Sequence, residues 1–312
     1  MYYKEWLCDW LEHYMKPTTK DKTFTRYCEI FEKHLTPKLG NYEIDEITPL
    51  VVQRQISEWL SCGNLITGEG LSANTVNSFI SVIQNSLKTA NMIGIADKYE
   101  MNKLKRPKIK EKQVTCFTLE EQRLIERAAM EDKRVKMRGI VLCLYTGLRI
   151  GELLALEWQD IDFNKCEISV VRSCHDSKDL TGKRTRVTDT PKTETSKRVI
   201  PLPKPILKML KDMKKNSASR YVIADGNKVL YVRSYQRSFE LLLKKLKISH
   251  HGFHSLRHTF ATRALECGVD VKTLSEILGH KSSTITLNRY AHSLMDHKKD
   301  MMNKIGKMFI VS

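Results

Sequence analysis

The sequence predicts a mainly α-helical protein of two domains, an all-helical first domain and an α-rich second domain that contains a small three-stranded antiparallel sheet. The chain has 312 residues, which at roughly 150 residues per domain suits two domains. Apolar residues recur at helical spacing along most of the chain, and strand-like alternation is confined to residues 166–202. With 41% hydrophobic and 29% charged residues, the composition is that of a folded globular protein.

The first domain is expected to span residues 1–106 and to begin with two amphipathic helices. Tyr3–Met15 places tryptophan, leucine and tyrosine side chains on one helical face, which should pack against a core. Thr23–Leu35 repeats this pattern. Pro37 and Gly40 follow and are expected to stop the second helix.

Two further helices of this domain are indicated by their N-terminal capping residues. Thr48 precedes a proline, the usual order of an N-cap and the first helical position, and the helix should run through Leu60. Ser72 caps another helix, whose apolar face extends to Leu87. Residues 1–106 therefore predict four or five helices and no strand.

Residues 107–116 are expected to be a basic linker, and residues 117–312 the second domain. Thr118 and Glu121 form a capping box, in which each side chain satisfies a backbone donor of the other residue. The helix that follows should reach about residue 131, and a second helix should end at Gly147.

A three-stranded sheet is expected next, from three segments that alternate between apolar and polar residues. These segments are Cys166–Ser173, Thr185–Thr190 and Arg198–Leu202. Beyond residue 203 the pattern is helical again as far as the C-terminus.

The charge distribution favours a polyanionic partner for the second domain. Residues 1–106 contain 13 basic and 13 acidic side chains, so the net charge of +17 lies entirely in residues 107–312. Such an excess suits nucleic acid, although a solubilising surface explains net charge alone equally well. Seven basic residues of the first domain and linker are the candidate DNA contacts: Lys20, Lys22, Arg26, Lys88, Lys103, Lys105 and Arg106.

Several classes of protein are excluded. The longest apolar stretch, residues 139–156, contains Arg149 and Glu152, so it does not fit a transmembrane helix. The first ten residues lack the apolar segment of a signal peptide. The eight cysteines form no CxxC pair, which is typical of reduced thiols in a cytoplasmic protein and excludes a disulfide scaffold.

Arg149 is the first candidate functional residue, because an arginine inside an apolar segment is costly unless it is paired. Glu152 lies three residues further on and would share its helical face, so a buried ion pair is one interpretation. An anion site is the other, because a guanidinium fork matches phosphate oxygens. The sequence leaves both open.

His254 and Arg257 are spaced to lie on one helical face, where they form a donor pair suited to an oxyanion. A zinc site at the nearby histidines is disfavoured, because neither an HExxH motif nor close cysteines accompany them. Asp160 and Asp162 are more typical of a turn before a strand than of a metal site. No metal and no cofactor are therefore predicted.

Residues 273–290 have the pattern of two helices joined by a short turn. Asp270 caps the first helix, Gly279 ends it, and a serine at 282 or 283 caps the next. A helix-turn-helix that binds DNA without catalysis is one interpretation of this segment. In that case Tyr290 is an ordinary surface aromatic residue.

Taken together, these residues form an ordered set, Arg149, then His254-x-x-Arg257, then Leu-Gly-His280, then Tyr290. The set closely resembles the tyrosine recombinase family, also called the phage integrase family. The resemblance covers nearly the whole chain: the Leu39-Gly40 and Ser72-x-x-Thr75 stretches are similar to the family's helical core-binding domain, and residues 157–163 resemble the entry to the catalytic domain's sheet.

The resemblance implies a DNA strand transferase with a phosphotyrosine intermediate. In this family Tyr290 would be the nucleophile, and Arg149, Arg257, His254 and His280 would stabilise the transition state. Glu152 would support Arg149. The family's lysine, the general acid, lies in the turn before the last strand, where Lys192 is assigned and Lys197 and Arg198 are competitors.

The resemblance also implies partners. These are double-stranded DNA recombination sites, further copies of the chain in a tetramer joined through the C-terminal helix (residues 291–309), and accessory DNA-bending or excision factors. Family integrases usually carry an additional arm-binding domain before the core-binding domain. Integration or excision of a mobile element is the expected role, chromosome-dimer resolution is an alternative within the family, and a non-catalytic regulator is the alternative outside it.

Overall fold

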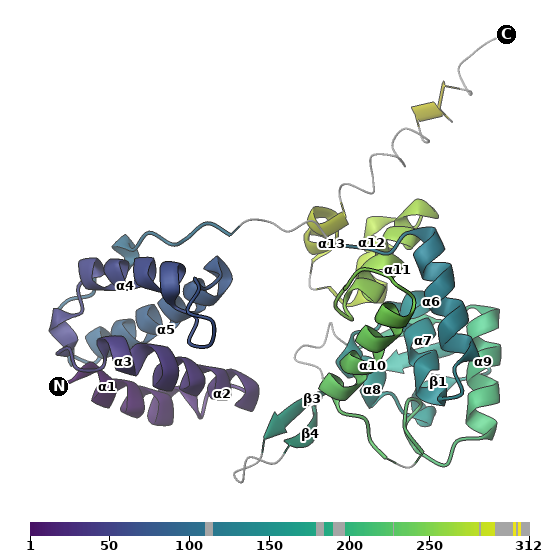
Figure 1. Cartoon of the computed structure of the whole chain (residues 1–312), viewed down its shortest axis with the longest axis horizontal. Helices are drawn as coiled ribbons and strands as arrows, with labels where there is room; N and C mark the ends of the chain where they lie inside the picture. The colour runs from purple at the N-terminus through teal and green to yellow at the C-terminus, as the bar shows by residue number, and fades with distance from the viewer. Residues whose placement is uncertain are drawn as a thin grey trace. The chain divides into compact units, whose positions relative to one another are not determined.

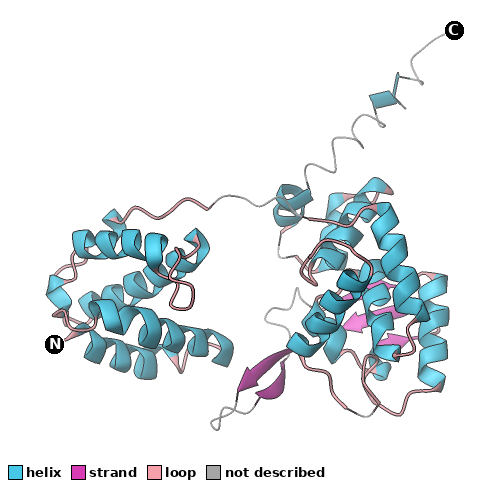
Figure 2. Ribbon diagram, viewed as in Figure 1, coloured by secondary structure: helices cyan, strands magenta, loops and turns pink. Residues whose placement is uncertain are grey.

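The computed structural model describes residues 1–109, 115–178, 184–189, 197–226, 228–280, 282–290, 302–303 and 305–306. The chain divides into two compact units, Met1–Lys112 and Gln113–Ser312, and each is considered by itself (Figure 1). In the described residues the first unit is helical, whereas the second combines helices with short strands (Figure 2). The mainly α-helical fold class is confirmed.

The first unit contains the helices α1 (Tyr3–Asp9), α2 (Asp21–Ile30), α3 (Thr36–Leu39), α4 (Pro49–Cys62) and α5 (Ala73–Met92). Single π-helical segments at Trp10–Met15 and Phe31–Leu35 continue α1 and α2, and 3-10 turns lie at Ile44–Glu46 and Met101–Lys103. Its core is built around buried aromatic side chains, with the Tyr3 hydroxyl 2.8 Å from Ser86 Oγ.

Both predicted N-caps of this unit are present. The Thr48 hydroxyl accepts a hydrogen bond from the backbone N of Val51, and Ser72 accepts one from Thr75. The expectation that Pro37 stops the second helix is wrong, because Pro37 lies in the first turn of α3. Proline is tolerated there, where its missing N–H has no helical partner to lose.

The second unit has eight helices among its described residues: α6 (Leu119–Glu131), α7 (Arg138–Thr146), α8 (Ile150–Ala155), α9 (Lys204–Lys215), α10 (Val232–Lys245), α11 (Ser255–Glu266), α12 (Val271–Leu278) and α13 (Ser283–Tyr290). Its strands are β1 (Ile161–Asp162), β2 (Glu167–Val170), β3 (Ser173–Lys178), β4 (Arg184–Asp189) and β5 (Arg198–Pro201). The Thr118–Glu121 capping box begins α6, as predicted.

The three-stranded antiparallel sheet exists, but one of its predicted strands is wrong. Its order is β1-β2-β5, whereas β4, from the predicted segment 185–190, pairs with β3 in a separate two-stranded sheet. The chain turns away after β2, where Arg172 binds Asp160 at 2.6 Å. The carboxylate of Asp176 on β3 then caps α10, at 2.8 Å from the backbone N of Val232. Alternation marks strands but does not identify their partners.

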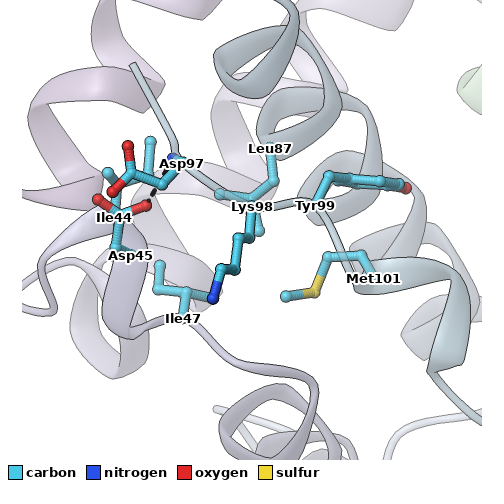
Figure 3. Close-up of a pocket in the computed structure, with 8 residues that line it drawn as sticks. All are labelled: Ile44, Asp45, Ile47, Leu87, Asp97, Lys98, Tyr99 and Met101. Carbon is cyan, nitrogen blue, oxygen red and sulfur yellow. Dashed lines mark hydrogen bonds between the residues drawn. The ribbon is translucent and has the colours of Figure 1, made fainter. Parts of the chain in front are cut away.

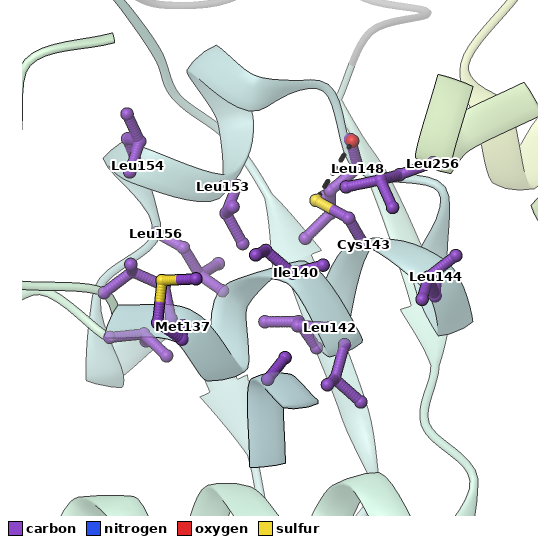
Figure 4. Packing of buried hydrophobic residues seen from close by; sticks show 14 of the residues in the cluster. Met137, Ile140, Leu142, Cys143, Leu144, Leu148, Leu153, Leu154, Leu156 and Leu256 are labelled. Carbon is purple, nitrogen blue, oxygen red and sulfur yellow. Dashed lines mark hydrogen bonds between the residues drawn. The ribbon is translucent and has the colours of Figure 1, made fainter. Parts of the chain in front are cut away.

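The core of the second unit lies beneath α7 and α8, and it supports the turn that joins them (Figure 4). Gly147 ends α7 with a φ of 63°, and a Cβ there would lie 2.6 Å from Phe260 and 2.8 Å from Leu278. Glycine is thus required both by the backbone and by the close approach of other helices. In the described part of the chain, no helix is long and apolar enough to cross a membrane.

Candidate active site

Arg149 lies at the N-terminal end of α8, directly after the turn that Gly147 begins. Its backbone N donates to Glu152 Oε2 at 2.9 Å, and its Nη1 atom donates to Glu152 Oε1 at 2.7 Å. The Glu152 side chain is buried, while 36% of the Arg149 side chain is exposed. The ion pair expected from the spacing is present, and it leaves part of the Arg149 guanidinium facing solvent.

Glu152 also binds a second arginine, Arg198 at the start of β5. Arg198 Nη2 lies 2.8 Å from Glu152 Oε2, and Nη1 lies 3.1 Å from Glu152 Oε1. The Arg198 side chain is only 6% exposed. A single carboxylate therefore joins two guanidinium groups from distant parts of the sequence.

The C-terminal end of α12 receives three arginines on three consecutive carbonyl groups. Arg198 Nε donates to Ile277 at 2.6 Å, Arg257 Nη2 donates to Leu278 at 2.6 Å, and Arg149 Nη2 donates to Gly279 at 3.0 Å. The last carbonyls of a helix lack intrahelical partners and carry partial negative charge. This end of α12 is therefore a suitable anchor for guanidinium groups.

Arg257, in the first turn of α11, joins the ends of two helices. Its Nη1 atom donates to the carbonyl of Gly147 at 2.7 Å, beside its bond to Leu278. Arg257 is 2% exposed, so its charge is compensated by helix-end carbonyls inside the domain. Both expected arginines thus meet at one turn of α12.

The two histidines are held differently. His280 follows Gly279 directly, and its Nδ1 atom lies 2.8 Å from the hydroxyl of Thr286, a fully buried residue of α13. This contact orients the ring and assigns Nδ1 to the protein. His254 precedes α11 and is exposed, with its ring perpendicular to that of His258 at a centroid distance of 4.5 Å.

Tyr290 is the last residue of α13, the helix that follows His280, so the backbone brings it to the same end of the domain as the α12 turn. Lys192 lies outside the described residues. Of its two competitors, Arg198 is committed to Glu152 and α12, and Lys197 immediately precedes it.

The site gathers more positive than negative charge. Burial raises the pKa of Glu152, but the hydrogen bonds and charge of Arg198, together with the charge of Arg149, outweigh it and bring that pKa down to about 2. One ionised carboxylate is therefore shared by several guanidinium groups. Such a site suits an anion with several oxygens, a phosphodiester above all.

This arrangement predicts that Glu152 stabilises the fold above mildly acidic pH. A carboxyl whose pKa falls from 4.5 unfolded to about 2 folded contributes stability that is complete above about pH 5 and is lost as the pH falls toward 2. The loss of free energy of unfolding in Glu152→Gln should therefore shrink by about 2 kcal/mol between pH 7 and pH 3. Urea unfolding of both full-length proteins measures it, and an equal loss at both pH values contradicts it.

The described residues contain no group of three or more histidine, cysteine, aspartate or glutamate side chains that could hold a metal ion. Asp160 has another partner, because it binds Arg172 at 2.6 Å through both carboxylate oxygens. The turn interpretation also fits Asp162, which accepts hydrogen bonds from the backbone N atoms of Asn164 and Lys165.

The seven basic residues singled out in the first unit and linker are all exposed. Two of them reach α5: Arg26 donates to Ser78 Oγ at 2.7 Å, and Arg106 donates to Ser81 and to Gln84 Oε1. Lys103 pairs with Glu100. The start of the predicted linker is held against the unit, since Asn77 Nδ2 donates to the carbonyl of Pro107 at 3.0 Å.

These contacts give α5 a distinctive outer face. The helix contains no acidic residue, and its partly or fully exposed positions are mostly asparagine, serine and glutamine. Arg26 and Arg106 bind to this face, and Lys88 lies near its end. Amides and hydroxyls with flanking cations are the groups that contact bases and phosphates.

A cavity of about 220 Å³ also lies in the first unit, between the turn at Ile44–Ile47 and the segment after α5 (Figure 3). Hydrophobic side chains line most of it, and Asp45 is occupied by the backbone N of Asp97 at 2.9 Å. None of the predicted site residues lines this cavity.

Two residues of the site were missed from the sequence as supporting groups. Arg198 was considered only as a competitor for the lysine, because its partners Glu152 and Ile277 are 46 and 79 residues away. Thr286 carried no signal of its own. Its position four residues before Tyr290 on one helix could have indicated a shared face.

Comparison with known proteins agrees with this architecture. Residues 112–297 match the phage integrase family, and residues 2–60 match the N-terminal SAM-like domain of phage integrases. A tyrosine recombinase XerC-like protein of Caldanaerobacter subterraneus subsp. tengcongensis is 28% identical, covering 96% of this chain and 82% of the relative. The transposase from transposon Tn916 of Enterococcus faecalis is 26% identical, over 94% and 75%.

Among solved structures, the fold is similar to that of the Tn1549 transposon integrase in complex with transposon right end DNA. The TM-score is 0.81 at 22% identity, and the match covers 98% of this chain and 100% of that one. The similarity extends through both units, so the helical first unit and the helical second unit with its small sheet occur together in that protein as well.

Proposed function

The chain belongs to the phage integrase family, and from this membership we propose that it is a tyrosine site-specific recombinase. It cleaves and rejoins duplex DNA through a 3′-phosphotyrosine intermediate and requires no cofactor. The observation that carries the proposal is the convergence of Arg149, Arg257 and His280 on the end of α12, the helix that precedes the Tyr290 helix.

In the proposed reaction, the Tyr290 hydroxyl oxygen attacks the scissile phosphorus and the bond to the 5′-oxygen breaks. One strand is then joined to the protein, and a 5′-hydroxyl is released. The same hydroxyl from a partner duplex reverses the step, so the energy of the ester is retained and no nucleotide is consumed.

Arg149 and Arg257 bind the non-bridging oxygens, on which negative charge increases in the transition state. Both guanidinium groups are held beforehand by helix-end carbonyls, so little reorganisation accompanies the reaction. His254 and His280 donate further hydrogen bonds, and the contact of His280 Nδ1 with Thr286 leaves Nε2 for the substrate. Glu152 orients Arg149.

Lys192 is proposed as the general acid that protonates the leaving 5′-oxygen, a role that suits an amine on a flexible stem. Lys192→Ala should lower cleavage by about 10²–10⁴-fold. A substrate with sulfur at the 5′-bridging position should restore the rate, because a thiolate leaves without a proton. Rescue of Lys197→Ala in place of Lys192→Ala would move the role to Lys197.

The first unit is proposed to bind DNA as the core-binding domain, through α5 and the residues Lys20, Lys22, Arg26, Lys88, Lys103, Lys105 and Arg106. The second unit is proposed as the catalytic domain. Recombination would then take place in a tetramer on DNA joined through residues 291–309, of which the structure describes only 302–303 and 305–306. Accessory DNA-bending or excision factors would act on the same complex.

Integration or excision of a mobile element is the proposed role, supported by the likeness to the Tn916 transposase. Resolution of chromosome dimers is the second candidate, supported by the XerC-like relative. The described thiols are unpaired, as suits a protein that acts on DNA in the cytoplasm.

A suicide substrate tests the proposal. Nicked DNA from the ends that flank the gene for this chain is incubated with the protein in EDTA, so that the cleaved fragment diffuses away. The expected result is an SDS-resistant complex that carries the 3′-phosphate side of the break. Specific binding without any such complex would support the non-catalytic helix-turn-helix regulator.

A further inference from the structure

Arg198 is a buried arginine of the second unit that the proposed reaction does not use. All three nitrogen atoms of its guanidinium donate to protein acceptors: Nε to the carbonyl of Ile277, and Nη1 and Nη2 to the two oxygens of Glu152. With its side chain 6% exposed, Arg198 has no surface on which to receive a phosphate. Its effect on substrate must therefore pass through its neighbours.

The first neighbour is Glu152, whose two oxygens are each shared between Arg149 and Arg198. Oε1 accepts from Arg149 Nη1 at 2.7 Å and from Arg198 Nη1 at 3.1 Å. Oε2 accepts from the Arg149 backbone at 2.9 Å and from Arg198 Nη2 at 2.8 Å. The bidentate contact with Arg198 fixes the plane of the carboxylate, and the carboxylate in turn directs the Arg149 guanidinium.

The second neighbour is the end of α12. Arg198 binds the carbonyl of Ile277, and Arg149 binds that of Gly279, two residues further on. Gly279 has a φ of 63°, and a Cβ there would lie 3.1 Å from two atoms of the Arg198 side chain. Arg198 therefore packs directly against the turn that holds Arg149.

We propose that Arg198 is a positioning residue for Arg149, because it fixes both Glu152 and the Gly279 turn between which the Arg149 guanidinium is held. This inference rests on the proposed cleavage of DNA. Arg198 links β5, α8 and α12, so it also ties the strand that follows the Lys192 turn to the helix that precedes the Tyr290 helix. The Arg149 site thus depends on how these three elements are joined.

The test compares the single-turnover cleavage rate of Arg198→Met with that of wild type on two suicide substrates. One carries the natural phosphodiester, and the other carries a methylphosphonate at the scissile position, in which a neutral methyl group replaces one charged non-bridging oxygen. Arg149→Met serves as the reference, because a group that acts through charge on these oxygens matters less when one charge is removed.

On the phosphodiester, Arg198→Met should cleave about 10²-fold more slowly than wild type, the size of effect that misplacement of a catalytic group produces. DNA affinity should remain within about twofold by gel shift, since Arg198 does not reach the DNA. On the methylphosphonate, the defects of Arg198→Met and Arg149→Met should both fall below about tenfold, because less charge needs to be neutralised.

Arg172→Met is the matched control, because it removes a partly buried arginine of the same domain that binds Asp160. It should lower thermal stability while the rate of the folded protein stays within about twofold of wild type on both substrates. If Arg198→Met fails to fold, Arg198→Lys replaces it, since lysine keeps the charge but loses the fork.

Two outcomes overturn the inference: a wild-type rate in the Arg198 variant, or an equal loss on both substrates while Arg149→Met is rescued. The second result would show that Arg198 only stabilises the fold. Absence of cleavage by wild type is distinguishable from both, because it contradicts the proposed function itself.

Discussion

Tyr290→Phe is expected to abolish the covalent complex with DNA, with a loss of at least about 10⁴-fold in its rate of formation. The substitution removes only the hydroxyl oxygen that is proposed to attack the phosphorus. Tyr290 is the last residue of α13, and phenylalanine suits the same backbone. Gel shift should therefore show unchanged binding, while the SDS-resistant band disappears.

The matched control is Tyr231→Phe, which removes a hydroxyl from another tyrosine of the same domain, at the start of α10. Its only described contact is a long hydrogen bond of 3.4 Å to the carbonyl of Arg184, so cleavage should continue at the wild-type rate. A covalent complex that persists in Tyr290→Phe would show that another side chain is the nucleophile.

Arg257→Lys should lower cleavage by about 10²–10³-fold, as removal of one preorganised donor does. Lysine keeps the positive charge but cannot bind the carbonyls of Gly147 and Leu278 and still reach a phosphate oxygen. Arg257→Ala is less informative. It leaves two buried carbonyls without partners, at a cost of about 1–3 kcal/mol each, and combines a folding defect with a catalytic one.

Arg263→Lys is the control for this prediction, because Arg263 lies on the same helix and also binds a backbone carbonyl, that of Phe117, at 2.9 Å. It should reduce stability slightly and leave single-turnover cleavage unchanged. If Arg257→Lys instead weakens DNA binding and thermal stability in proportion to its rate, Arg257 is a structural arginine and the proposed clamp is wrong.

The sequence predicted the features of this fold that depend on neighbouring residues. Thr48, Ser72 and Thr118 begin helices because each hydroxyl accepts a bond from a backbone N–H three residues later. Features that depend on distant contacts were harder to predict. The strand at 184–189 pairs with β3 and not with the β1-β2-β5 sheet, because Asp176 and the turn at Arg172 direct the chain away.

The same division holds for the candidate site. The Arg149–Glu152 pair could be predicted from a spacing of three residues, and the residues of the ordered set could be named from the family resemblance. The end of α12 as a common anchor could not, because it binds arginines that are 21, 79 and 130 residues away. Backbone carbonyls carry no residue-type signal, so only the folded chain reveals them.

The measurement that tests the central claim most directly is the identification of the residue joined to DNA. The complex formed on the suicide substrate in EDTA is digested with nuclease and trypsin, and the peptides are analysed by mass spectrometry. Cleavage after Arg289 yields a peptide over residues 290–298 in which Tyr290 is the single tyrosine. The account predicts a nucleotide phosphate on that tyrosine. A nucleotide on any other residue, or specific binding with no modified peptide, would contradict it.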